Sequence, residues 1–299
     1  MTAHDSRRRA PRLRALGATF ALALFGAAHA DGGHHSVWVV QGGHNTLTLV
    51  GSVHALPAAS HELPEEAWRA YEQAKAVVME VDLGNPEVGN VLEVTQTLGT
   101  LPEGQTLEGV LGPELYASFA AHAQRLGLEP GILARLRPWL VAVMLQQAQL
   151  TSLGLDASAG VDEQIAQRAA VDHKPIIGLE TMAEQLGLFA HLSMDEQRQY
   201  LQGALEDEDH FAAEFDALVA AWRAGDARAL EQMMGAEFKD SPALFRTLTT
   251  ERNQRWMRTL TGLLGEDRDY LVVVGALHLV GRDGLVELLR RRGYAVVQH

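Results

Sequence analysis

Two histidines occupy matching positions in the sequence. His54 ends the stretch Val50-Gly51-Ser52-Val53-His54, and His278 ends the stretch Val274-Gly275-Ala276-Leu277-His278. Each stretch follows a short apolar run that predicts a buried strand. The glycine in each stretch allows a sharp turn and a close approach to a ligand, because it has no Cβ atom. The repeated pattern predicts a pseudo-symmetric pair of imidazoles at two strand ends.

Carboxylates close two further predicted strands. Glu80 and Asp82 end the apolar run that begins at Ala76, and Glu180 follows another run at 175–179. In a parallel sheet, ligands bind beyond the carboxyl ends of the strands, so these groups are expected to meet the two histidines. Imidazoles and carboxylates together suit a divalent ion such as Zn, Mn, Co or Fe. The alternative is structural, with histidines hydrogen-bonded in the core and Glu80 paired with an arginine.

A metal ion at this edge would polarise a substrate carbonyl and lower the pKa of its bound water. Glu80 can then act in two ways, either as a ligand to the metal or as the general base that moves a proton. The ligand role is favoured, because two histidines alone give a divalent ion too few ligands. The chain contains no cysteine, so cysteine nucleophiles, disulfides and thiolate metal sites are excluded.

A third polar group, Glu251-Arg252-Asn253, lies within a predicted helix. Arg252 and Arg255 are three residues apart and therefore share one helix face. Spacing alone favours a solvated amphipathic helix with surface ion pairs. A guanidinium turned toward the strand ends would instead bind a substrate carboxylate or stabilise an oxyanion.

Short apolar strands that alternate with helices must position these residues. The predicted strands cover 36–40, 46–51, 76–82, 175–179, 270–275 and 294–298, and the predicted helices cover 63–74, 113–126, 138–150, 161–171 and 282–292. The pattern predicts an α/β fold with a mainly parallel central sheet and flanking helices. Residues 31–299 are expected to form one domain, in which the long helical section 194–264 is an insertion or cap.

The first thirty residues have the pattern of a secretory signal peptide. Five arginines precede an apolar run at 16–28, and Ala28-His29-Ala30 is a small-x-small cleavage site. This run is shorter than the roughly 20 residues that a permanent membrane anchor needs. We expect cleavage after Ala30 and a periplasmic or secreted protein without a stable membrane anchor. An uncleaved anchor is the alternative.

Composition narrows the classes of function. The chain has 299 residues and a formal net charge of −13. This acidic balance argues against a general nucleic-acid-binding protein, which needs a basic face for phosphates. Hydrophobic residues make up 47% and charged residues 21% of the chain, a composition typical of globular proteins and not of disordered chains.

Several spaced motifs together resemble the TraB/GumN family. They are Gly51-Ser52-Val53-His54, Glu80-Val81-Asp82, Lys174-Pro175, Gly178-Leu179-Glu180-Thr181 with Gln185, Glu251-Arg252-Asn253 and the stretch from Val274 to Tyr294. The resemblance covers nearly all of the chain after residue 30. It implies a fold shared with erythromycin-esterase and ChaN-like proteins, and a similarity to the Tiki metalloproteases. It further implies that a divalent metal (Mn, Co or Zn) binds at His54, His278 and Glu80, and that Glu80, Arg252, Asn253 and Glu180 serve catalysis.

The activity that this resemblance implies is that of an exported metal-dependent hydrolase, with a peptidase as the leading form. Its substrate would be a peptide or a small molecule. The alternatives are an envelope protein that binds metal, haem or peptide without turnover, and an esterase that acts on a small molecule. The resemblance also places Arg252 over the site. Arg252→Lys is then expected to reduce activity strongly and to leave the thermal midpoint nearly unchanged, because lysine keeps the charge but loses the planar fork.

Overall fold

The computed structural model describes residues 35–299 except 59, 61–62, 83, 85–90, 206–207 and 240–241. The predicted signal peptide, residues 1–30, therefore lies outside the described residues. Among the helices that are described, none combines the length and the apolar character that crossing a bilayer requires.

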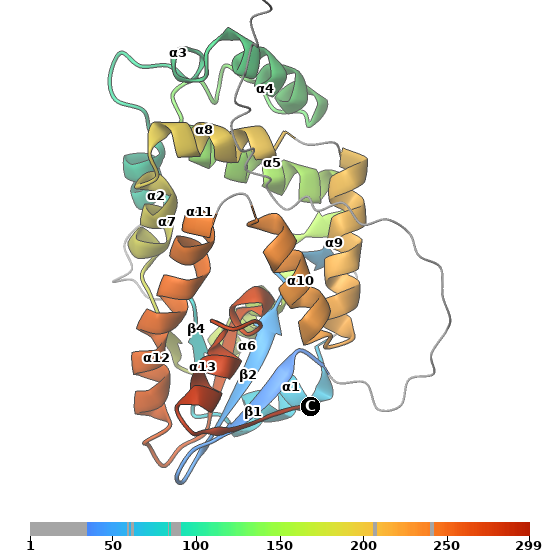
Figure 1. Cartoon of the computed structure of the whole chain (residues 1–299), viewed down its shortest axis with the longest axis vertical. Helices are drawn as coiled ribbons and strands as arrows, with labels where there is room; N and C mark the ends of the chain where they lie inside the picture. The colour runs from blue at the N-terminus through green and yellow to red at the C-terminus, as the bar shows by residue number, and fades with distance from the viewer. Residues whose placement is uncertain are drawn as a thin grey trace, which may run out of the picture.

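A six-stranded sheet with the order β6-β4-β7-β2-β1-β8 forms the centre of the described structure (Figure 1). The strands are β1 (Val37–Gln41), β2 (Thr46–Ser52), β4 (Ala76–Met79), β6 (Ile176–Gly178), β7 (Tyr270–Gly275) and β8 (Ala295–Gln298). Strands β6, β4, β7 and β2 are parallel, whereas β1 is antiparallel to both of its neighbours. The predicted α/β fold with a mainly parallel sheet is confirmed.

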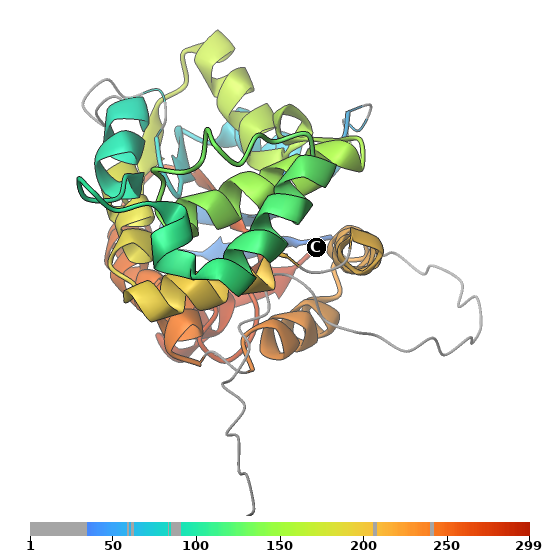
Figure 2. The ribbon, with the colours of Figure 1, turned by 90° about the horizontal axis from the view of Figure 1, so that it is seen from above.

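The central strands are buried because their sequences are apolar at every position. All of β4 and residues 270–274 of β7 are buried, as expected for parallel strands whose two faces are both covered by helices. Figures 1 and 2 show α1 and α6 on one face of the sheet and α12 and α13 on the other. The strand predicted over 76–82 ends at Met79, so that Glu80 and Asp82 lie just beyond the sheet.

The helices account for most of the remaining described chain. They are α1 (Glu65–Gln73), α2 (Val91–Gly99), α3 (Leu107–Leu111), α4 (Pro113–Arg125), α5 (Pro138–Ser152), α6 (Val161–Asp172), α7 (Met182–Ala190), α8 (Met194–Gly203), α9 (Glu208–Arg223), α10 (Ala227–Glu237), α11 (Pro242–Phe245), α12 (Glu251–Leu263) and α13 (Leu285–Arg291). The helix predicted over 282–292 begins later, because Gly281 adopts a positive φ of 79° and the next residues form a turn.

Three helices, α2, α3 and α7, were not predicted. Helix α7 carries a readable start signal, a capping box in which Thr181 and Glu184 bond to each other's backbone N–H groups. Helix α3 has five residues and α2 has nine, so neither extends the apolar period over the length that predicts a helix. The predicted helical section 194–264 is observed as α8–α12, and its description as an insertion or cap stays a prediction.

A second core of buried side chains lies apart from the core that surrounds the sheet. It is formed mainly by α3, α4, α5 and α8, with residues such as Leu107, Phe119, Leu145 and Leu201 fully buried. Figures 1 and 2 show these helices gathered at one end of the molecule, over one end of the sheet. The fold therefore consists of a layered α/β part that positions the strand ends and a helical part beside it.

Candidate active site

The register of the parallel strands brings the predicted site residues to one edge of the sheet. Met79 pairs with both Gly178 and Val273, so β4 and β6 end at the same level, and β7 continues two residues further to Gly275. The backbone N–H of Glu180 donates to the carbonyl oxygen of Glu80 over 2.9 Å, which continues the pairing beyond the strands. Glu80 and Glu180, which lie 100 residues apart in the sequence, therefore become direct neighbours.

The carboxylate of Glu80 is held from three sides. Its Oε1 accepts a hydrogen bond from the backbone N–H of Gly275 (2.8 Å), and its Oε2 accepts from Nε2 of Gln185 (3.1 Å) and Nη2 of Arg252 (2.5 Å). Burial by itself would raise the pKa of Glu80. The charges of the neighbouring histidine and arginine side chains and the Gly275 N–H outweigh burial and lower this pKa to about 2. Glu80 is therefore ionised at neutral pH.

Arg252 is buried, with 6% of its surface exposed, and it links the site together. Its Nε and Nη2 form a fork on the carboxylate of Glu180, with distances of 3.1 and 2.6 Å. Its Nη1 donates to the carbonyl oxygen of Leu248 (3.1 Å) and to Nε2 of His278 (3.0 Å). These bonds and the bond to Glu80 use every N–H group of the guanidinium.

The interpretation of Arg252 as part of a solvated helix face is therefore wrong, and the inward orientation expected from the resemblance is confirmed. Because its donors are all used within the protein, Arg252 orients Glu80, Glu180 and His278 and has no N–H left for a substrate. Arg255 differs, since half of its side chain is exposed and its Nη2 lies 3.8 Å from Glu180.

A local irregularity in the helix helps to place Arg252. Residues Arg246–Thr250 form a π-helical segment directly before α12, and its residue Leu248 supplies the carbonyl that accepts from Arg252. Such segments are common at functional sites. The indole of Trp256, one turn further along α12, lies under the guanidinium at 4.6 Å, and it contacts the His278 ring at a centroid distance of 4.6 Å with the two rings tilted by 45°. Trp256 thus fixes both groups in the interior.

His278 is held in a single tautomer. A guanidinium can only donate, so Nε2 of His278 must accept from Arg252, and Nδ1 must carry the proton. That proton is donated to Oδ1 of Asn253 over 2.7 Å. Asn253 is completely buried, and its Nδ2 donates to the carbonyl oxygens of His278 and Asp283. Burial and the nearby Arg252 lower the pKa of His278 to about 4, so it is neutral at pH 7.

His54 has different surroundings, with 67% of its side chain exposed. Its Nδ1 lies 2.9 Å from Oδ2 of Asp162, in the first turn of α6. The carboxylate of Asp162 raises the pKa of His54 to about 9, so that the imidazole carries a proton at neutral pH. The two histidines of the repeated motif are therefore not equivalent, since one is buried and neutral and the other is exposed and charged.

Close backbone packing brings Asp162 to His54. The strands β3 (Leu56–Pro57) and β5 (Leu155–Asp156) pair just after His54 and just before α6. The N–H of Val161 donates to the carbonyl oxygen of Val53 over 3.0 Å. A Cβ atom on Gly160 would lie 2.5 Å from the carbonyl oxygen of His54, so this contact requires glycine.

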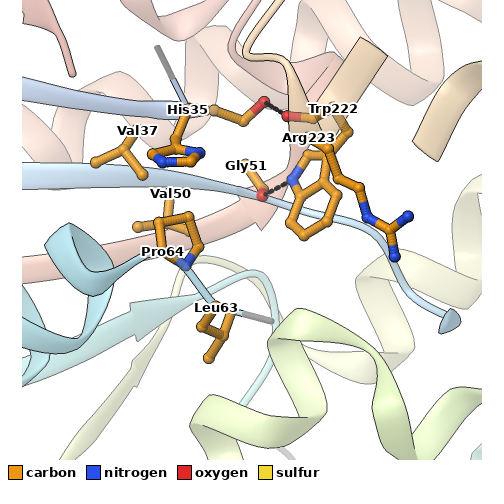
Figure 3. Close-up of a pocket in the computed structure, with 9 residues that line it drawn as sticks. His35, Val37, Val50, Gly51, Leu63, Pro64, Trp222 and Arg223 are labelled. Atoms are coloured by element: carbon orange, nitrogen blue, oxygen red, sulfur yellow. Dashed lines mark hydrogen bonds between the residues drawn. The ribbon is translucent and has the colours of Figure 1, made fainter. Parts of the chain in front are cut away.

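The end of β2 is also fixed by a hydrogen bond from helix α9. Nε1 of Trp222, near the end of α9, donates to the carbonyl oxygen of Gly51 over 2.7 Å (Figure 3). The hydroxyl of Ser36, just before β1, donates to the carbonyl oxygen of Trp222 over 3.0 Å. These bonds fix the strand end from which the chain continues to His54.

The two histidines and Glu80 surround one point beside Gly275. A Cβ atom built on Gly275 would lie 3.4 Å from Oε1 of Glu80, 3.6 Å from Cδ2 of His278 and 3.7 Å from Nε2 of His54. Each histidine is held through Nδ1, which directs Nε2 toward the site. Histidines that bind metals usually have this arrangement.

These donors fit a divalent ion in chemical type, but they are not arranged as a ready metal site. Within the described residues, no group of three His, Asp or Glu side chains is placed to hold a metal ion. The reason lies in Arg252, whose Nη1 occupies the lone pair of His278. Binding a metal through His278 would require Arg252 to release it, and binding through His54 would require loss of a proton.

An open cavity of about 550 Å³ adjoins the site between the sheet edge, α6 and α7. Of the predicted site residues, His54 and Glu80 line it, whereas Arg252, Asn253, Glu180 and His278 do not. Asp82 does not join the cluster, because its carboxylate caps the N–H of Gly84. A substrate in this cavity would therefore meet His54 and Glu80, with the other residues behind them.

Sequence reasoning assigned no role at the site to three residues that shape it, Asp162, Gln185 and Trp256. Asp162 lies in the first turn of the helix predicted over 161–171, and no local signal links it to a histidine 108 positions away. Gln185 belongs to a motif that carries the resemblance, but it lies on α7, a helix that was not predicted. Trp256 lies one turn after Arg252 on α12, and this spacing was the signal that could have placed it on the same inward face.

Comparisons with known proteins agree with the motifs. Residues 36–298 match the TraB/PrgY/gumN family. The chain is similar to YbaP of Escherichia coli, with 26% identity over 275 residues that cover 86% of this chain and 94% of YbaP. No solved structure matches the chain significantly.

Two animal proteins are more distant relatives. Metalloprotease TIKI1 of Danio rerio is 24% identical over 78% of this chain, and Metalloprotease TIKI2 of Xenopus tropicalis is 25% identical over 87%. The matched regions span 57% and 59% of these two proteins, so the chain corresponds to little more than half of their length. With a family match that covers nearly all of the described residues, the chain belongs to the TraB/PrgY/gumN family.

Proposed function

We propose that the protein is a metal-dependent hydrolase that cleaves amide bonds of peptides. The observation that carries the proposal is the convergence of His54, His278 and Glu80 on one point beside Gly275, next to an open cavity. The distant relationship to two proteins named as metalloproteases supports a hydrolase. Hydrolysis adds water across the C–N bond and releases a carboxylate and an amine.

His54, His278 and Glu80 are the residues that would hold the metal, with Mn, Co or Zn as candidates. A divalent ion supplies Lewis acidity toward a substrate carbonyl. Glu80 is assigned as a ligand and not as the general base, because a carboxyl group with a pKa of about 2 is a weak base at neutral pH.

The remaining residues act by positioning. Arg252 holds the carboxylate of Glu80 in place, and Glu180 balances the buried charge of Arg252. Asn253 keeps the proton of His278 on Nδ1 and so leaves Nε2 as the acceptor. Asp162 orients the exposed ring of His54. The expected catalytic roles of Arg252, Asn253 and Glu180 are therefore proposed as supporting roles.

We also propose that the protein is exported and acts in the periplasm or outside the cell. This proposal rests on the arginines, the short apolar run and the cleavage site within residues 1–30. Its partners would be peptide substrates, and the acidic net charge of −13 argues against nucleic acids.

The test of the activity is metal analysis of the purified protein, followed by cleavage of a peptide pool with Mn, Co or Zn and with a chelator. His54→Ala and His278→Ala should each abolish cleavage and lower the metal content. The matched control is His44→Ala, which removes an exposed histidine at the opposite end of β2. This variant should cleave at the wild-type rate.

Two results would overturn the proposal. Cleavage that survives both substitutions at the site would exclude the metal mechanism. A wild-type protein that binds metal or haem but cleaves neither peptides nor esters would be the binding protein that forms the alternative function.

A further inference from the structure

The cavity beside His54 and Glu80 has a composition that the hydrolase proposal does not explain. Its interior is mainly apolar, with side chains that include Met79, Ala166, Ile176, Met182 and Val273. Its volume of about 550 Å³ falls within the range of about 300–1,000 Å³ that is typical of ligand pockets. Catalysis at the strand ends alone does not require an apolar space of this size.

Two buried polar atoms at the same cavity have no hydrogen-bond partner in the structure. One is Oγ of Ser52, in a residue that is only 4% exposed. The other is Oδ1 of Asp162, whose second oxygen is bonded to His54. Both residues line the cavity. A buried polar atom without a partner costs free energy, so a small rotation of either side chain toward the cavity would let it bond to a ligand.

We propose that this cavity is the substrate's side-chain pocket and that it binds an uncharged apolar residue next to the cleaved bond. The apolar interior takes the side chain. After a small rotation toward the cavity, Oδ1 of Asp162 accepts a main-chain N–H of the substrate, and the hydroxyl of Ser52 bonds to the adjoining amide. The site residues His54 and Glu80 then lie at the entrance, beside the amide to be cleaved. This inference rests on the proposed hydrolase function.

The charged residues that line the cavity determine which substrate side chains it excludes. The carboxylates of Glu80, Asp162 and Glu163 line it together with the protonated imidazole of His54, so the lining is acidic on balance and would repel an acidic side chain. The preferred side chains are leucine, methionine and phenylalanine, which fill an apolar space without adding charge.

The first experiment profiles the cleavage of peptides that differ at one position beside the cleaved bond. The wild type should prefer leucine, methionine or phenylalanine over aspartate by at least about 10-fold in kcat/KM, the range that apolar pockets achieve. Ala166→Phe, which fills the pocket, should reduce kcat/KM for the leucine peptide about 10-fold, mainly through KM. Met182→Ala, which enlarges it, should shift the preference toward phenylalanine.

Val171→Phe is the matched control, because it adds the same bulk to an exposed position of the same helix that does not line the cavity. The pocket is supported if Ala166→Phe and Met182→Ala change the side-chain preference in opposite directions, toward smaller and larger side chains, and the control does not change it. General damage to the fold would not produce such opposite changes in preference. A flat side-chain profile in an active enzyme would overturn the pocket and leave the hydrolase proposal intact.

A second experiment needs no turnover. Methionine methyl groups labelled with carbon-13 are followed by NMR while N-acetyl-leucinamide is added, with N-acetyl-aspartamide as the comparison. The signal of Met182 should shift with the leucine amide alone, and Met144, which packs on the second core, should not move. A shift of the Met182 signal in a protein that cleaves no peptide would support the pocket and contradict the hydrolase proposal. No shift of Met182 would overturn the pocket.

Discussion

Replacing Arg252 by lysine tests whether this residue holds the site together. The guanidinium makes hydrogen bonds to two carboxylates, one imidazole and one carbonyl, and five N–H groups take part. A lysine ammonium has only three donors on a point charge, so at least two of these bonds are lost. The buried carboxylates of Glu80 and Glu180 are then incompletely paired.

The size of the effect follows from those bonds. Each hydrogen bond to a charged group contributes about 1.5–3 kcal/mol, so the free energy of unfolding should decrease by about 3 kcal/mol or more. For a chain of this size, one kcal/mol shifts the thermal midpoint by about 2–4 °C, which gives a decrease of at least about 6 °C. Because Arg252 is buried, we therefore replace the nearly unchanged midpoint expected from the sequence for Arg252→Lys with a predicted decrease.

The assay is thermal unfolding followed by circular dichroism at fixed pH, with Arg255→Lys as the control. Arg255 is half exposed and lies 3.8 Å from Glu180, so its replacement should change the unfolding free energy by less than about 0.5 kcal/mol. A midpoint of Arg252→Lys within about 1 °C of the wild type would refute the account of Arg252 as the residue that holds the buried cluster.

Three further predictions test other parts of the account. Gly160→Ala should lower the free energy of unfolding by about 1–3 kcal/mol in urea titrations, because the added Cβ would lie 2.5 Å from the carbonyl oxygen of His54. Gly43→Ala is the control, since a Cβ added there meets no other residue within 4 Å, and an equal loss in this variant would contradict the prediction. The folded-state pKa of His278 is about 4 and its ordinary value is 6.5, so the unfolded chain binds this proton at a higher pH, and the free energy of unfolding should fall as the pH decreases from 6.5 to about 4. His278→Asn should remove this part of the dependence of the unfolding free energy on pH, and an unchanged dependence would argue against a neutral, buried His278. N-terminal sequencing of protein from the cell envelope should begin at Asp31, and an intact start at Met1 in the cytoplasmic fraction would refute export.

The sequence determined the fold class and the identity of most candidate site residues. Apolar runs such as Leu271–Val274 predict strands buried on both faces, because only a sheet covered on two sides can bury every side chain. The parallel arrangement then places residues that follow the strands at one edge, which is how Glu80 and Glu180 were found. Local patterns are sufficient here, because each depends only on neighbouring residues and on the period of the element.

The pairing of these residues was decided by the tertiary structure. Strand register sets the distance between Glu80 and Glu180, and the inward turn of α12 brings Arg252 to both of them. On spacing alone the same helix predicts a solvated face. Burial of Arg252 depends on two carboxylates from distant strands that compensate its charge, and no local pattern records that compensation.

The two histidines also show what the sequence determines and what only the tertiary structure determines. Their motifs share the form V-G-x-x-H, yet His278 is buried and neutral and His54 is exposed and protonated. The sequence determined where each imidazole leaves its strand. The tertiary structure determined the partners, Asn253 and Arg252 for one and Asp162 for the other, and a pKa depends on those partners and on burial.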